Sequence, residues 1–193
     1  MRPILSAMRP EKLQPVCDGG IVMTKEQKAI HFLTMQHIQN VSRRLTDVAI
    51  KILERAKIHD NSKLLSPEME MFAEATPRLA GLTYGSDEYR KELKKLGVAL
   101  EHHYQENSHH PEHYTYQIFD MDFLDLIEML CDWCAAVERH KDGNIWRSLE
   151  INRDRYGMSD QLVKIFVNTL KAFGYKDDAA DNGKGEKHAH RPE

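Results

Sequence analysis

The stretch TDVAIKILERAKIHD, residues 46–60, joins an apolar helical pattern to a histidine and a carboxylate at its end. Its apolar residues at 48, 49, 52, 53 and 56 have the spacing of one helix face. His59 and Asp60 therefore fall on the last turn of a predicted helix, where neighbouring side chains can reach one cleft. Imidazole and carboxylate together suit zinc, iron or manganese. A His-Asp pair alone is more typical of a solvated helix end, so the other histidines decide its meaning.

Histidines are concentrated in the segment HHYQENSHHPEHY, residues 102–114. The chain has eleven histidines in 193 residues, and five of them lie in this segment. A protein surface has no reason to concentrate imidazole in this way, so the segment is a candidate source of metal ligands. The simpler interpretation is that His109, His110 and His113 cap and pack a loop.

The stretch DFLDLIEMLCDWCAAV, residues 122–137, predicts a buried helix that carries acids. Asp125, Glu128 and Asp132 lie on one face of that helix, and the remaining positions are apolar nearly all round. A buried carboxylate needs a cation or hydrogen-bond donors, because burying it unpaired is costly. Histidines and a metal would meet that need, although spacing alone does not decide which acid binds.

Residues His59-Asp60-Asn61-Ser62-Lys63 resemble the HD-x-[GS]-K motif of the HD superfamily, a group of metal-dependent phosphohydrolases. His37 before this motif, the histidine-rich segment after it and Asp132 in a late helix resemble the wider order of that family's ligands. Residues 25–170 also resemble a small family of phage and bacterial proteins of unknown function.

The resemblance implies an all-α fold, an HD-domain-like helical bundle, that holds one or two divalent transition-metal ions (Mn, Fe, Zn, Co or Ni). The metal ligands that it implies are His37, His59, Asp60, His103, His109 and Asp132. The catalytic residues that it implies are Asp60, which would bridge two ions, Lys63, which would contact a phosphate oxygen, and His110, which would protonate the leaving group. Asp125 or Glu128 could replace Asp132 or orient a histidine from behind it.

The function implied by the resemblance is hydrolysis of a nucleotide or another small phosphorylated compound, with metal-activated water as the nucleophile. One alternative keeps the ligands but uses two irons and O₂, as some HD-type oxygenases do. A second alternative is a helical binding protein in which the metal has only a structural role. HD-type proteins are often dimers, so a homodimer is also an expectation by resemblance.

Composition narrows the protein class. Apolar residues at 41% and charged residues at 30% describe an ordinary globular chain. A net charge of −3 offers no basic surface for a long nucleic acid. No apolar run approaches the roughly 20 residues that span a bilayer, so no membrane partner is expected. Three cysteines, an odd number, suit a reducing cytoplasm.

The chain is predicted to have a flexible N-terminal arm (1–23), a single HD-like helical domain (24–175) and a disordered tail (176–193). A capping box of Thr24 and Gln27 predicts that the first helix begins at residue 25. Its apolar face would include Ile30, Leu33 and Val41. The later helices are expected at 66–75, 87–104, 121–140, 145–155 and 159–173, with loops at 77–87 and 107–116.

A metal shared by His37 and His59 requires a turn between them. Twenty-two residues of unbroken helix would separate the two by about 33 Å. The segment 42–47, with Thr46 or Asp47 as a new N-cap, is the place where we expect that turn. His31 is the alternative first ligand, because its longer spacing leaves a turn more room.

Overall fold

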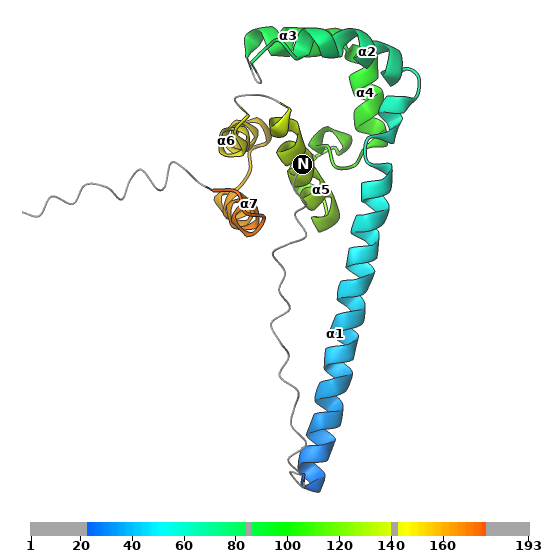
Figure 1. Ribbon diagram of the computed structural model, residues 1–193, viewed down its shortest axis with the longest axis vertical. Helices are drawn as coiled ribbons and strands as arrows, with labels where there is room; N and C mark the ends of the chain where they lie inside the picture. The colour runs from blue at the N-terminus through cyan, green and yellow to red at the C-terminus, as the bar shows by residue number, and fades with distance from the viewer. Residues whose placement is uncertain (1–22, 84–85, 140–142, 177–193) are drawn as a thin grey trace, which may run out of the picture. The chain divides into compact units, whose positions relative to one another are not determined.

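The protein is all-helical in the computed structural model, which describes residues 23–83, 86–139 and 143–176 (Figure 1). The described residues form no strand, so the all-α prediction is confirmed. The predicted arm lies almost wholly outside the described residues, as does the predicted tail from residue 177. None of the described helices is long and apolar enough to cross a membrane.

The first helix, α1, runs without a break over Lys25–Ile58. It begins where the capping box predicts, because the Thr24 hydroxyl accepts from the Gln27 amide and the Gln27 side chain accepts from the Thr24 amide. The turn expected at 42–47 is wrong. The Thr46 hydroxyl bonds the Ser42 carbonyl inside the helix instead of capping a new one, and no Pro or Gly interrupts the run.

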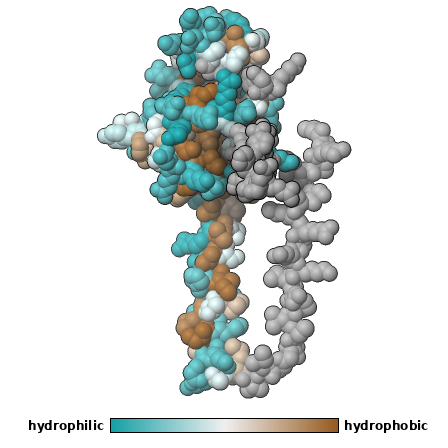
Figure 2. Space-filling model, turned by 90° about the vertical axis from the view of Figure 1, so that its left-hand side faces the viewer, coloured by the Kyte–Doolittle hydropathy of each residue, from teal (hydrophilic) through white to brown (hydrophobic). Residues whose placement is uncertain are grey.

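The chain packs as two units, residues 1–47 and 48–193, and the boundary lies inside α1. None of the residues of α1 is buried, although many are large and apolar (Figure 2). The face predicted to meet a core is exposed, with Ile30 at 64%, Leu33 at 58% and Val41 at 42% of full accessibility. Apolar periodicity thus identified a face of the helix but not a partner for it.

The second unit begins with the end of α1 and contains the remaining helices. These helices are α2 (Glu68–Leu79), α3 (Asp87–Lys95), α4 (Gly97–Glu106), α5 (Phe123–Glu138), α6 (Ile145–Tyr156) and α7 (Asp160–Ala172). Three short 3-10 helices connect them, namely η2 (Asn61–Leu64), η3 (Pro111–His113) and η4 (Gln117–Phe119).

Two of the predicted helix boundaries differ from the structure. The helix expected over 87–104 is broken between α3 and α4. Gly97 at this break has a φ of 21°, a conformation that residues with a Cβ atom rarely adopt. The helix expected to stop before Pro77 instead includes it and ends at Leu79, because one missing N–H near a helix end removes only a single hydrogen bond.

A core formed by α5, α6 and α7 supports the second unit. Met129 and Leu130 of α5, Leu149 of α6 and Leu170 of α7 are all almost fully buried. Trp133 of α5 stacks at 6.5 Å between ring centroids on Tyr156 of α6. This core fixes one face of α5, and the acids of α5 lie outside that cluster of buried apolar residues.

Candidate metal centre

Asp60 ends α1 and begins the turn into η2. Its backbone is left-handed, with φ 57° and ψ 17°, a conformation that Asp tolerates better than most residues. The His59 amide still bonds to the Arg55 carbonyl, whereas the Lys63 amide bonds to the carbonyl of Asp60 itself. The chain therefore leaves the helix at the residue whose carboxylate lies at the centre of the site.

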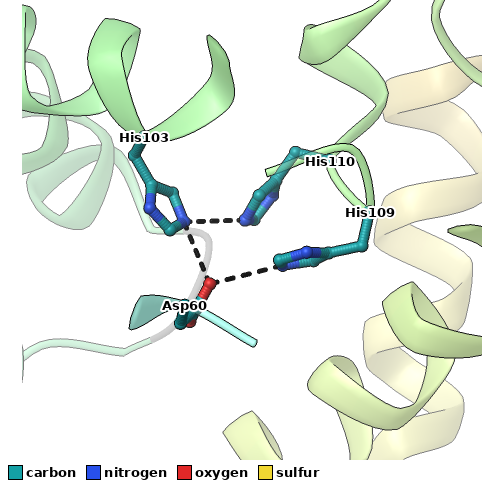
Figure 3. A group of neighbouring side chains, drawn as sticks. All are labelled: Asp60, His103, His109 and His110. Carbon is teal, nitrogen blue, oxygen red and sulfur yellow. Dashed lines mark hydrogen bonds and ion pairs between the residues drawn. The ribbon is translucent and has the colours of Figure 1, made fainter. Parts of the chain in front are cut away.

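The Asp60 carboxylate lies among side chains from several segments (Figure 3). Its Oδ1 is 3.4 Å from Nε2 of His103, on α4, and 3.5 Å from Nε2 of His109, in the loop after α4. Its Oδ2 is 2.5 Å from Nζ of Lys63 and 3.5 Å from Nε2 of His59. Oδ1 of Asp60 and Nε2 of His109 are buried, and neither has a hydrogen-bond partner among the described residues.

Carboxylates hold the other nitrogen of three of these imidazoles. Glu128 of α5 accepts from Nδ1 of His59 at 2.8 Å and lies 3.3 Å from Nδ1 of His109. Glu68 of α2 accepts from Nδ1 of His103 at 2.8 Å. An ionised carboxylate only accepts hydrogen bonds, so each Nδ1 carries a hydrogen and a neutral ring directs a lone pair from Nε2. When the rings are neutral, these lone pairs converge on Asp60, which is the arrangement of metal ligands whose rings are oriented by carboxylates.

His110 completes a group of four candidate ligands with Asp60, His103 and His109, whose ligand atoms all lie within 4.8 Å of one another. Its Nε2 is 2.9 Å from Nε2 of His103, and its ring lies 4.2 Å from the ring of His109. Burial, together with these two neighbouring imidazoles, lowers the pKa of His110 to about 3. A neutral imidazole at physiological pH keeps the lone pair that a metal needs.

Asp132 of α5 belongs to a second group, with His59 and Asp60. Its Oδ1 is 3.7 Å from Nε2 of His59. Asp60 is common to this group and to the four-residue group, and it offers one oxygen toward each. The structure therefore brings together two aspartates that lie seventy-two positions apart in the sequence. Glu128 forms a third group, with His59 and His109.

Charges in the centre favour a cation. Hydrogen bonds to Asp132 and Glu128 raise the pKa of His59 to about 10. Burial would raise the pKa of Asp60, but Lys63 and His59 more than offset it, so the pKa lies below its usual range. Burial likewise opposes ionisation of Asp132, and the bond from His59 holds its pKa low. The two aspartates are thus ionised, and His59 is protonated when no other cation neutralises them.

Several sequence-predicted residues lie outside these groups. His37 and His31 are exposed on α1, and unbroken helix over 22 residues is about 33 Å long, so His37 cannot share an ion with His59. Nδ1 of His113 donates to the Tyr104 carbonyl at 2.8 Å, which is a contact within the loop. Asp125 is buried but accepts from Tyr114 and Ser108 and pairs with Arg55, so its oxygens are already used.

Two supporting residues were not predicted for this role. Glu68 was expected only as an early residue of the helix at 66–75, yet its side chain is completely buried. Arg55 is the second such residue, and its guanidinium donates to both Glu128 and Asp125. Its place four residues before His59, on the same helix face, was the available signal.

Comparison with known proteins adds a family but no activity. A family model described as a family of unknown function matches residues 26–172. No curated protein and no solved structure matches the chain. The match includes nearly all of α1 and every segment that contributes to the centre.

Proposed function

The chain belongs to DUF5662, a family of unknown function, and from its side-chain geometry we propose that it is a metal-dependent hydrolase of small phosphoric esters. Nucleotides and similar phosphorylated metabolites are the proposed substrates. The proposal combines the geometry of the centre with the resemblance of His59-Asp60-Asn61-Ser62-Lys63 to the HD motif.

One observation carries the metal assignment. Oδ1 of Asp60 is buried, has no hydrogen-bond partner in the part of the chain that the structure describes, and faces Nε2 of His103 and of His109. If both rings are neutral with hydrogen on Nδ1, each Nε2 carries a lone pair that faces the lone pairs of Oδ1 of Asp60. Such an approach of acceptor atoms is unfavourable without a positive charge between them. A divalent transition metal supplies that charge and suits a set of imidazoles with a carboxylate.

The residues that would hold one ion are Asp60, His103, His109 and His110, and His59, Asp60 and Asp132 would hold a second. A bound divalent metal would lower the pKa of water toward neutrality and polarise a phosphoryl oxygen. Glu128 orients the rings of His59 and His109 from behind.

Lys63 is the proposed contact for a phosphate oxygen. Its side chain is 35% exposed, and its Nζ is 2.5 Å from Oδ2 of Asp60. The Lys63 ammonium group therefore lies at the edge of the centre and is accessible to a substrate from solvent. His110 suits a ligand better than a general acid, because its pKa of about 3 leaves the ring neutral at neutral pH.

Elemental analysis of the purified protein tests the metal, and a phosphoester screen tests the activity. We expect one or two transition-metal ions per chain, and metal-dependent release of phosphate from at least one class of nucleotide or generic ester. The variants His109→Ala and Asp132→Asn should lose metal and activity.

His113→Ala is the matched control, because this histidine comes from the same loop but belongs to none of the candidate ligand groups of the described residues. It should keep both metal and activity. A wild-type protein that binds no divalent metal after metal-supplemented expression would refute the proposal.

A second candidate, oxidation by O₂ at an iron centre, is favoured by the three imidazoles in the four-residue group. Histidine-rich sets suit iron. Iron as the metal bound, together with substrate-dependent O₂ consumption and no phosphate release, would favour this candidate over the hydrolase.

A further inference from the structure

Glu68 is the most completely buried acid of the described chain, with no exposed surface. It is the first residue of α2. Each of its two carboxylate oxygens accepts a hydrogen bond from one of two consecutive histidines of α4. Oε1 lies 2.7 Å from Nδ1 of His102 and Oε2 lies 2.8 Å from Nδ1 of His103. Burying a carboxylate is costly unless such bonds compensate for the lost water.

A carboxylate only accepts hydrogen bonds, so each of the two histidines that contact Glu68 presents a hydrogen on Nδ1. For His103, this leaves Nε2 as the atom that faces Oδ1 of Asp60.

His103 has two other polar neighbours that would favour the opposite tautomer. The side-chain nitrogen of Asn107 is 3.1 Å from its Nδ1, and the Ser62 hydroxyl is 3.3 Å from it. The amide of Asn107 already donates to the Ser62 hydroxyl and to the His103 carbonyl, so its two hydrogens are used. Without Glu68, a small rotation would let either group donate to Nδ1 and move the ring hydrogen to Nε2.

His102 does not need this bond for the metal. Its side chain is 35% exposed, and it belongs to none of the candidate ligand groups in the described part of the chain. The pair of bonds therefore holds one histidine that faces the centre and a second that serves mainly to satisfy the other oxygen of Glu68.

We propose that Glu68 is a positioning residue of the metal centre, which fixes His103 in the tautomer that offers Nε2 to the ion. The inference rests on the proposed function, because it assigns Glu68 a part in the same centre. Glu68 touches neither substrate nor ion, and it acts only through His103.

Two measurements test it, with Co²⁺ as the probe ion. The first is the Co²⁺ dissociation constant with the visible spectrum of the bound ion, for wild type, Glu68→Met, Glu68→Gln and Glu112→Gln. The second is the histidine tautomer in the ion-free protein, read from long-range ¹H–¹⁵N correlation spectra. The thermal unfolding midpoint of each ion-free variant separates lost binding from lost folding.

Glu68→Met keeps the length of the side chain but has no acceptor. We expect it to weaken Co²⁺ binding about 10–100-fold, which is typical for residues that orient a metal-binding histidine. His103 should then show hydrogen on Nε2. Glu68→Gln should lie between Glu68→Met and wild type, because its carbonyl can still accept from one imidazole.

Glu112→Gln is the control, since this acid is bonded to Arg155 and Tyr156 instead of a histidine of the centre. Its Co²⁺ affinity should stay within about twofold of wild type. A folded Glu68→Met variant with wild-type affinity and hydrogen still on Nδ1 of His103 would overturn the inference.

If Glu68→Met does not fold, Glu68→Gln decides. Its amide nitrogen must face His102 or His103, so one of the two tautomers has to reverse, and unchanged Nδ1–H signals for both rings would overturn the inference. Failure of the proposed function looks different, because the wild-type protein itself would then bind no Co²⁺.

Discussion

At the scale of single residues, Asp60 combines a backbone and a side-chain role. Its left-handed backbone ends α1, and its carboxylate faces His59, His103 and His109. The two roles can be separated by substitution, because Asn tolerates the same backbone conformation as Asp but carries no charge.

The variant Asp60→Asn should therefore fold but lose the ion. We expect metal affinity to fall about 100-fold or more, beyond the usual effect of a supporting residue. Far-UV circular dichroism should stay that of wild type. Calorimetric titration with Mn²⁺ or Co²⁺ checks the affinity, and a variant that binds as tightly as wild type would remove Asp60 from the centre.

Metal binding should release a proton from His59. The pKa of this imidazole is about 10 in the ion-free protein, mainly because of its bonds to Asp132 and Glu128, so the ring is protonated at pH 8. Nε2 must lose that proton to bind an ion. The enthalpy of metal binding at pH 8 should thus vary with the ionisation enthalpy of the buffer, with a slope near one proton per chain.

The same pKa gives a direction for stability. A group whose pKa is higher in the folded than in the unfolded state stabilises the fold below its unfolded pKa, near 6.5, and this contribution is lost as pH rises through about 10. Urea unfolding of the metal-free protein from pH 6 to 10 should show this loss, and His59→Gln should remove it. An identical pH dependence in the two proteins would contradict the assignment.

Arg55 holds two acids of α5 at once, through Nε to Glu128 and Nη2 to Asp125. Lysine has the charge but not the planar fork that makes both contacts. Arg55→Lys should therefore cost about 1–2 kcal/mol of unfolding free energy, since one acid loses a charged hydrogen bond. Urea denaturation measures this cost, and Arg44→Lys, on the exposed part of α1, is the control that should show no change.

At the scale of elements, α1 and α7 have apolar residues in opposite environments. Leu45 of α1 is 65% exposed, whereas Leu170 of α7 is completely buried. Leu45→Gln should change the unfolding free energy by less than about 0.5 kcal/mol, and Leu170→Ala should cost about 2–5 kcal/mol. Urea denaturation compares the two, and a large loss for Leu45→Gln would mean that this face is covered in solution.

Local signals predicted where elements begin better than where they end. The capping box at Thr24 is confirmed, because the Thr24 hydroxyl accepts from the Gln27 amide. The helix expected from residue 159 has Ser159 as its N-cap, and the Ser159 hydroxyl accepts from the Leu162 amide. The break at Gly97 and the continuation past Pro77 were missed, because glycine and proline have effects that depend on the surrounding packing.

At the scale of the whole molecule, sequence predicted the all-α fold and named most of the side chains that converge. His59, Asp60 and the histidines of 102–114 were recognisable by type and spacing. Their convergence on common groups was expected only from the resemblance, because spacing along the chain does not fix how distant segments pack. His37 was included because an HD-type site needs an early histidine, and the unbroken α1 places it beyond reach of His59.

The supporting acids differ in how far the sequence revealed them. Glu128 was expected as an alternative ligand or as a residue that orients a histidine, whereas Glu68 looks in sequence like an ordinary acid in the first turn of a helix. Only the burial of Glu68 beside Nδ1 of His103 reveals its role. Sequence motifs therefore indicate atoms that bind a ligand more readily than atoms that orient those ligands.

The left-handed turn at residue 60 also has an evolutionary consequence. Asp, Asn and Gly enter this conformation more readily than other residues, and only Asp can be negatively charged. A lineage that no longer needs the ion can drift to Asn here without disturbing its architecture. The identity of this one residue in a homologue would then distinguish a protein still under selection for the chemistry from one that has kept only the scaffold.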